Sequence, residues 1–195
     1  MIRPLLRRVR GDRGYTLIEM LTVMIIMGIV IGSLTTVFVS ASNSESDMNR
    51  RFQAQLTARL ALDKMRREVH CANVVSSATP STSSASSITI TLPAYCKTGS
   101  GSITWCTRSV STNRYALYRI IGSSCSGGTK WADYLVASSS APACSGALCI
   151  FGYTAQSTAS LAKLHVDFPV NVRPAKTVDL YELTDDVVLR NSTRS

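Results

Sequence analysis

Apolar and polar residues separate along the chain into one long apolar stretch and a series of short alternating segments. Between Gly14 and Glu45 the only charged residue is Glu19, and Met20–Val39 is apolar apart from Gly, Ser and Thr. A helix needs about 20 apolar residues to cross a hydrocarbon core of ~30 Å. The pattern therefore predicts a membrane-spanning helix within residues 15–44.

A second helical pattern follows directly after this stretch. Apolar residues recur at spacings of three to five and predict one buried stripe; they are Met48, Phe52, Leu56, Leu60, Met65 and Val69. The charged residues, Glu68 among them, are expected on the opposite face. Residues 15–70 contain no proline. We therefore expect one continuous helix of roughly 55 residues, about 80 Å long at 1.5 Å per residue.

After Cys71 the pattern shortens to β type. Ser76–Ser87 is almost entirely Ser, Thr and Ala, and it indicates a flexible loop. Segments rich in Ile, Val, Thr and Tyr then predict strands: Ile88–Leu92, Ile103–Arg108, Tyr115–Ile121, Tyr134–Val136, Leu148–Tyr153, Leu161–Phe168, Val178–Leu183 and Val187–Arg190. One face of an antiparallel sheet would cover the helical stripe. The predicted fold class is α+β, with a long N-terminal helix packed on a β-rich head.

These patterns predict four parts: a leader (1–14), a membrane-spanning half of the helix (15–44), an amphipathic half (45–75) and a head (76–195). The leader holds five arginines and one aspartate, which account for +4 of the formal charge of +9. Positive residues beside an apolar span stay in the cytoplasm, so we expect the head outside the cytoplasmic membrane. The remaining charge is mild and does not by itself indicate a nucleic-acid partner.

All six cysteines lie on the predicted outer side: Cys71, Cys96, Cys106, Cys125, Cys144 and Cys149. An even number in an oxidising compartment predicts up to three disulfides, with 15 possible connectivities. The alternative is a metal site. The chain has no Cys-x-x-Cys pair and only two histidines, so zinc is not expected. No other cofactor is expected either.

The junction between leader and span carries the most specific motif, Gly14-Tyr15-Thr16-Leu17-Ile18-Glu19. Glycine before a scissile bond lets the backbone enter a narrow cleft without a Cβ clash. A carboxylate within an apolar span is costly to insert, so Glu19 is a functional candidate by default. The motif thus combines a candidate cleavage site with a candidate intramembrane charge.

This motif resembles the class III signal of type IV prepilins and type II secretion pseudopilins. The resemblance implies that a prepilin peptidase cuts after Gly14 on the cytoplasmic face and that the new N-terminal residue, Tyr15, is methylated. It also implies that Glu19 pairs with the Tyr15 amine of a neighbouring pilin subunit, which offsets the cost of a buried carboxylate. The expected product is a filament subunit, assembled from the bilayer by a membrane platform and displayed at the cell surface.

Two further runs, Ala58–Ala72 and Tyr181–Asn191, resemble minor pilins of the W type and J-type pseudopilins. They favour a minor subunit that joins a tip or priming complex of a type IV pilus. A type II secretion pseudopilin and a DNA-uptake pilus subunit remain alternatives, as does a secreted or membrane-anchored binding domain. Cleavage after Ala41 by signal peptidase is disfavoured, because the apolar core exceeds the 7–15 residues of an ordinary signal and contains Glu19.

Catalysis and DNA binding are the two other functions that the residues could indicate. An enzyme is disfavoured because the chain has no Gly-x-Ser-x-Gly, phosphate-loop or Glu-x-x-His motif, and structural roles are expected for His70 and His165. DNA binding rests on an interval rich in basic and aromatic residues: Arg108, Arg114, Tyr115, Tyr118, Arg119, Lys130 and Trp131. The alternative is that the tyrosines are sheet residues and the cations are solvated on its outer face.

Overall fold

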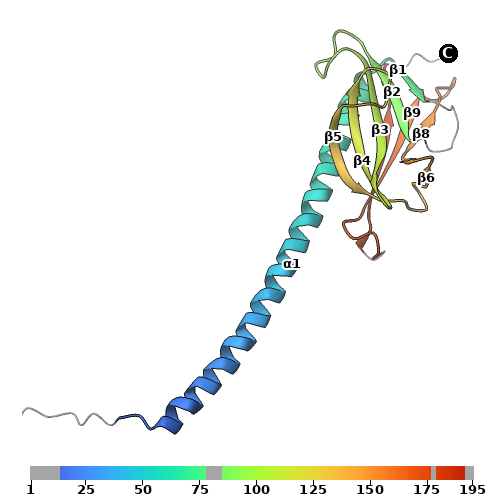
Figure 1. Ribbon diagram of the computed structural model, residues 1–195. Coiled ribbons are helices and arrows are strands. Elements are labelled where there is room, and N and C mark those ends of the chain that lie inside the picture. The colour runs from blue at the N-terminus through green and yellow to red at the C-terminus, as the bar shows by residue number, and fades with distance from the viewer. Residues whose placement is uncertain (1–13, 78–84, 177–178, 192–195) are drawn as a thin grey trace, which may run out of the picture. The chain divides into compact units, whose positions relative to one another are not determined.

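The computed structural model describes residues 14–77, 85–176 and 179–191, so most of the expected leader lies outside it. One helix, α1 (Leu17–Cys71), precedes a set of strands (Figure 1). They are β1 (Val74–Ser77), β2 (Ser87–Leu92), β3 (Gly101–Ser111), β4 (Arg114–Ile121), β5 (Thr129–Leu135), β6 (Ala143–Cys144), β7 (Ala147–Leu148), β8 (Phe151–Thr154), β9 (Lys163–Val170) and β10 (Tyr181–Val188). The chain divides into two compact units, Met1–Asp47 and Met48–Ser195. The predicted α+β class and the length of the helix, 55 residues, are confirmed.

The first unit contains the apolar part of α1. By length and composition this helix is able to cross a membrane, and its most apolar 18-residue window buries none of its residues within the protein. Its large side chains, from Leu17 to Val39, are about half to four-fifths exposed. An apolar surface of this extent requires lipid or other protein chains around it.

Hydroxyl groups within this apolar part are satisfied by the helix itself. Thr22, Ser33, Thr35 and Thr36 each donate a hydrogen bond of 2.7–2.9 Å to a backbone carbonyl three or four residues earlier. Such bonds remove the cost of placing a hydroxyl in hydrocarbon. The four polar residues are therefore compatible with a lipid environment.

In the second unit, the last part of α1 packs on the sheet through small residues. Ala54, Ala58 and Ala61 are at most 4% exposed, and Met65 and Val69 are fully buried. The predicted stripe is thus confirmed at its C-terminal end. It is wrong at its other end, because Met48, Phe52 and Leu60 are more than half exposed. Alanines allow the helix to approach the sheet closely, and this turns the larger side chains outward.

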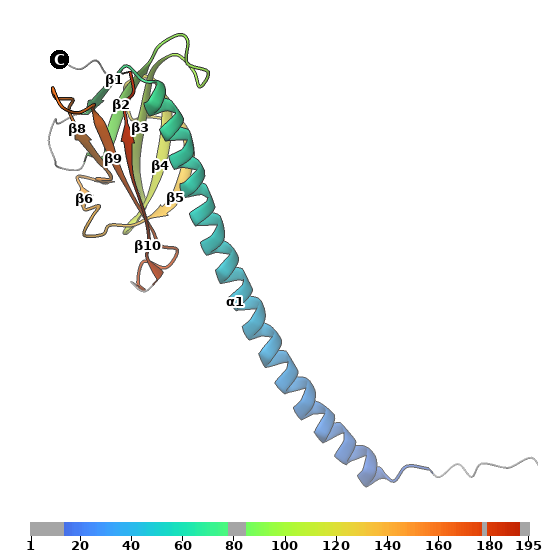
Figure 2. The same cartoon turned by 180° about the vertical axis from the view of Figure 1, so that it is seen from behind.

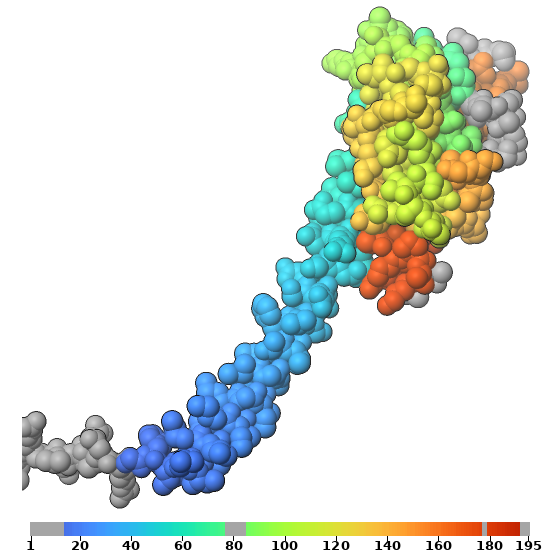
Figure 3. Space-filling model, viewed as in Figure 1, coloured from blue at the N-terminus to red at the C-terminus, as the bar shows by residue number. Residues whose placement is uncertain are grey.

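The main sheet is antiparallel and runs in the order β1-β2-β3-β4-β5-β9-β10, with β8 paired to β9. β6 and β7 form a separate hairpin. Figure 2 shows the last turns of α1 crossing one face of this curled sheet, in front of β3 and β4. The core lies between the two layers, with Trp105, Phe151 and Phe168 as its largest buried side chains. In Figure 3 the described part of the connection between β9 and β10 (orange-red) lies beyond strands β3–β5, at the lower end of the head.

Several strand predictions needed correction. The segments 178–183 and 187–190 were expected as two strands, but residues 181–188 form the single strand β10. The predicted strand Leu148–Tyr153 is divided between β7 and β8, and β5 begins at Thr129 rather than at Tyr134. β1 and β6 were missed. Part of β1, Ser76–Ser77, lies in the expected loop, whose residues 78–84 are outside the described chain.

Candidate functional site

The predicted cleavage site lies immediately before the helix. Gly14, Tyr15 and Thr16 have no regular secondary structure, and α1 begins at Leu17. Gly14 is exposed, and no side chain or other distant atom of the described chain comes within 4 Å of the position that its Cβ would take. The Tyr15 side chain is 77% exposed. The described residues on both sides of the Gly14–Tyr15 bond are therefore exposed, and none of the described residues requires glycine at this position.

Thr16 and Glu19 set the start of the helix. The backbone N–H of Glu19 lies 3.3 Å from Thr16 Oγ1 and 3.0 Å from the Thr16 carbonyl oxygen. Thr-Leu-Ile-Glu is thus an N-terminal capping sequence, with the hydroxyl at the N-cap and the acidic residue three positions later. A carboxylate in the first turn also interacts favourably with the positive end of the helix dipole. The same residues that resemble a processing signal therefore fix where the helix starts.

Glu19 is exposed within an otherwise apolar surface. Cleavage after Gly14 would give Tyr15 a free amine. Tyr15 precedes Glu19 by four residues, which is about one helical turn along the chain. If two subunits are offset along the helix axis by about one turn, the amine of one chain comes to the depth of the carboxylate of the other. Cleavage and charge pairing at Gly14, Tyr15 and Glu19 remain predictions.

Glycines in the apolar helix add a feature that the sequence reading missed. Gly28 and Gly32 are four residues apart, so they lie on the same face of α1. The positions that their Cβ atoms would take are open. Small residues at this spacing let helices approach closely in a membrane. The helix face at Gly28 and Gly32 therefore forms an open strip without side chains, which suits close packing against another helix.

A buried ionic network joins the helix to the sheet. Glu68 was expected on the exposed polar face, but its side chain is fully buried. Trp105 Nε1 on β3 donates to Glu68 Oε2 at 2.8 Å, and Arg119 on β4 donates to Oε1 at 2.8 Å. Lys64 Nζ lies 3.2 Å from the same oxygen. The network fixes the rotation of α1 about its own axis relative to the sheet.

Most cations of the basic and aromatic interval have partners inside the head. Arg114 makes two hydrogen bonds to Asp133, at 3.1 and 2.9 Å, and its guanidinium lies 4.0 Å from the centre of the Tyr134 ring. Lys130 donates to Asp133 at 2.8 Å. Burial opposes ionisation of Asp133, but hydrogen bonds from Arg114, Lys130 and the Tyr134 N–H, with the charge of Arg114, hold the pKa of its carboxyl below the ordinary value. Tyr134 adopts a left-handed backbone, with φ of 61°, and its N–H donates to Asp133.

The remaining members of the interval follow the same pattern. Arg108 stacks over Tyr118 at 3.5 Å and donates to the Gly127 carbonyl, and Trp131 packs against Trp105 with 5.9 Å between ring centres. With Arg119 bound to Glu68, these side chains consolidate the sheet. The arrangement supports the structural interpretation over a DNA-binding strip.

All six cysteines are paired, as Cys71–Cys96, Cys106–Cys125 and Cys144–Cys149. The first ties the end of α1 to the connection after β2. The second holds the β4–β5 connection to β3, and the third closes the β6–β7 hairpin. The described residues contain no cluster of His, Cys, Asp or Glu that suits a metal ion. Disulfides at these places stabilise a small head in an oxidising compartment.

The capped apolar helix, which is long and apolar enough to cross a membrane, and the disulfide-bonded β head fit a membrane-anchored protein. Residues 9–35 match the family model of the prokaryotic N-terminal methylation motif. This match identifies the junction as a class III signal and, with the long apolar helix, is consistent with a type IV pilin-like protein. No curated protein and no solved structure matches the chain. The motif points to a structural filament subunit that is processed by a prepilin peptidase and assembles with other pilin subunits.

Proposed function

We propose that this chain is a minor subunit of a type IV pilus or a related filament, cut between Gly14 and Tyr15 and methylated on Tyr15. The observation that carries the proposal is the coincidence of three features at one junction. They are an exposed glycine, a Thr16 cap that starts the helix, and Glu19 in its first turn. The methylation motif at residues 9–35 supports the same interpretation.

The proposed mechanism begins with the subunit held in the cytoplasmic membrane by its apolar helix, with its N-terminus inside and its head outside. Cleavage gives Tyr15 a free amine, and Glu19 of a neighbouring subunit neutralises it. An unpaired charge in a low-dielectric region is strongly penalised, so the pairing selects subunits at one axial register. The open strip at Gly28 and Gly32 supports close helix packing in the same assembly.

A minor rather than a major subunit is proposed because the head carries an extended sheet and three disulfides, and because of the W-type and J-type resemblances. The head would then be displayed at or near the filament tip. A type II secretion pseudopilin and a DNA-uptake pilus subunit share every feature of the junction. They differ from the pilus subunit only in the machine that receives the chain.

Detection of the subunit in surface filaments tests this proposal. Sheared surface filaments and the membrane fraction are separated and probed with an antibody to the head. Recovery of the processed chain in sheared filaments, at much lower abundance than a major subunit, is the expected result. A chain that remains wholly in the membrane fraction, or one that is released as a soluble protein, would contradict it.

A further inference from the structure

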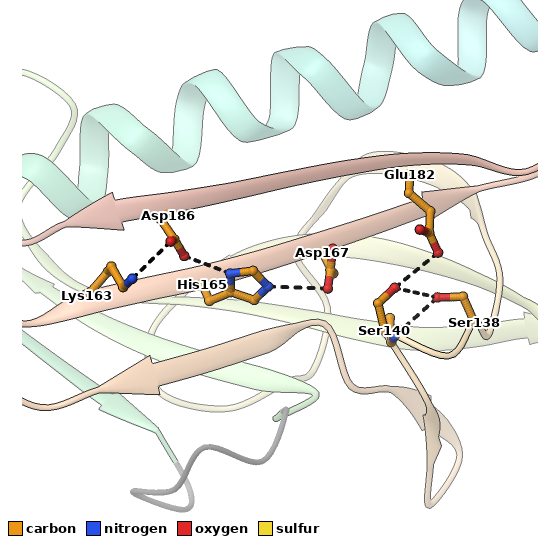
Figure 4. Close-up of polar contacts among 8 residues, drawn as sticks. Ser138, Ser140, Lys163, His165, Asp167, Glu182 and Asp186 are labelled. Atoms are coloured by element: carbon orange, nitrogen blue, oxygen red, sulfur yellow. Dashed lines mark hydrogen bonds and ion pairs between the residues drawn. The ribbon is translucent and has the colours of Figure 1, made fainter.

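The outer face of strands β9 and β10 carries a histidine held between two carboxylates (Figure 4). His165 on β9 faces Asp186 on β10, its direct partner in the strand register. The ring atom Nδ1 lies 2.7 Å from Asp186 Oδ1, and Nε2 lies 3.3 Å from Asp167 Oδ2. Lys163 Nζ donates to the other oxygen of Asp186 at 3.0 Å.

Only the protonated ring satisfies both of these contacts. A neutral imidazole has one N–H and one lone pair, so it donates to one carboxylate and turns a lone pair toward the other. Asp167 is the carboxylate that needs this N–H most. Its side chain is 8% exposed, and its Oδ1 atom has no hydrogen-bond partner among the described residues. A buried carboxylate without partners is costly, so a neutral ring keeps its N–H on Asp167 and turns the Nδ1 lone pair toward Asp186. Loss of the proton from His165 therefore removes the hydrogen bond that crosses from β9 to β10.

Neighbouring elements leave space for the ring and add no competing charge. Gly152 of β8 pairs with His165, and a Cβ at Gly152 would lie 3.4 Å from the His165 Cβ. The other residues of β8, Phe151, Tyr153 and Thr154, carry no charge. Further along β10, Glu182 is bound by Ser140 Oγ at 3.1 Å. Among the residues that the structure describes, the charged groups that contact the ring or its partner carboxylate are Asp186, Asp167 and Lys163.

The strand that this cluster holds is the last strand of the sheet in its hydrogen-bonded order, and it also contacts α1. On its other face, Arg66 of α1 binds Asp185, and Tyr181 accepts a hydrogen bond from Arg59 at 2.9 Å. Among the described strands, β10 pairs only with β9. Edge elements of this kind open locally more readily than central strands. A change in its pairing with β9 therefore alters how firmly the head is closed against the helix within the second unit.

We propose that His165 is a proton-controlled clasp that ties β10 to β9 when it is charged and releases the outer side of β10 when it is neutral. The hydrogen bond to Asp186 outweighs burial and, with Asp167, raises the pKa of His165 above its ordinary value. His165 therefore contributes stability that is complete below about pH 6.5 and is lost as the pH rises through its higher folded value. Hydrogen bonds from His165 and Lys163 lower the pKa of Asp186, so the contribution of Asp186 is complete above about pH 3.8 and fails only in stronger acid.

Hydrogen exchange of the full chain in detergent micelles tests the clasp. Exchange of the β10 amides is compared between the natural chain and His165→Gln at about pH 5.5 and about pH 8, which bracket the range of histidine titration. Both chains share the β10 sequence, so intrinsic exchange rates cancel in the ratio. At the lower pH we expect the natural chain to be about twofold to fivefold better protected, the range for half-exposed ion pairs, and at the higher pH we expect no difference. A ratio that is the same at both pH values would overturn the proposal.

The second histidine supplies a matched control. His70 Nδ1 lies 2.9 Å from the Val188 carbonyl oxygen, so it contacts the same strand without a facing carboxylate. The His70→Gln chain should show the same pH dependence of β10 exchange as the natural chain. If that pH dependence disappears in His70→Gln, the effect belongs to His70 and not to His165. This variant also leaves His165 as the only histidine, so its ring can be titrated directly by NMR. The ring should titrate above an ordinary histidine and shift downward on adding Asp186→Asn; titration at or below the ordinary value would refute the clasp.

Discussion

The indole N–H of Trp105 donates a 2.8 Å hydrogen bond to the carboxylate of Glu68 in the interior of the head. The same carboxylate binds Arg119, whose side chain is 15% exposed. The buried carboxylate of Glu68 on α1 is thus bound by side chains from two strands, β3 and β4. Such a network specifies one rotation of the helix on the sheet, and its removal leaves other groups unsatisfied.

Replacing Glu68 with Ala should therefore destabilise the head by about 3 to 5 kcal/mol, because Arg119 and the Trp105 N–H lose a buried partner. Denaturant unfolding of the full chain in micelles, followed by tryptophan fluorescence, measures this loss. Asp63→Ala is the matched control, since Asp63 lies on the same helix with a side chain that is 59% exposed. It should change the stability by less than about 0.5 kcal/mol.

Glu68→Gln retains the shape of the side chain and covers the case in which the alanine variant fails to fold. It should be less stable than the natural chain and more stable than Glu68→Ala. Equal stability of all three chains would show that the network contributes nothing to holding α1 on the sheet.

The position of Glu68 also marks where sequence reasoning succeeded and where it failed. Long-range periodicity predicted α1 nearly to the residue, because a 55-residue pattern without proline has few alternatives. The buried face of its second half was predicted correctly at Met65 and Val69 but wrongly at Met48, Phe52 and Leu60, because large apolar residues were expected to face the sheet. The sheet instead takes the alanines at 54, 58 and 61, whose value for close packing does not register on a hydrophobicity scale.

A signal for burial of Glu68 was nevertheless present. It follows Met65 by three positions, so it lies on the helix face that Met65 marks as buried. What the sequence could not supply were its partners on β3 and β4, which are 37 and 51 residues away. Long-range pairing of this kind depends on strand register, which local patterns do not specify.

Strand β10 was divided in the prediction for a related reason. Thr184, Asp185 and Asp186 interrupt its apolar pattern, and aspartate is unfavourable in strands. In the folded head Asp185 binds Arg66, and Asp186 binds His165 and Lys163. Tertiary partners thus override the local preference. The junction at Gly14–Glu19, by contrast, was readable because its motif is local and contiguous.

Substitution of Gly14 tests the processing claim. Gly14→Leu should abolish the product that begins at Tyr15, because a branched side chain before the scissile bond obstructs a cleft that accepts glycine. The fold itself should be unaffected, since no distant atom of the described chain lies near the Gly14 Cβ position. Cleavage is followed by the mobility of the chain in membranes from cells that express the peptidase.

Gly11→Leu is the control for Gly14→Leu, because it places the same side chain three residues upstream. Its processing should remain normal. Accumulation of a product lacking residues 1–14 from the Gly14→Leu chain would remove the basis for the claim.

Glu19→Val separates processing from assembly. The substitution leaves Gly14 and Tyr15 in place, so cleavage should proceed, while the charge that neutralises a neighbouring amine is lost. We expect incorporation into filaments to fall at least about tenfold, the equivalent of about 1.4 kcal/mol per subunit contact. Glu45→Gln removes the next acidic residue along the helix and should assemble normally. Normal incorporation of the Glu19→Val chain would argue against the pairing role.

The central claim is that the chain is cut and modified at one junction, and the intact mass of the mature protein with its first residue measures this most directly. The protein is purified from membranes of a cell that contains the processing enzyme, and its N-terminal peptide is sequenced by mass spectrometry. The account predicts a chain that begins at Tyr15 and carries one added methyl group on the Tyr15 amine. A mature chain that begins at Ser42, or one that retains Met1 and the whole leader, would contradict it.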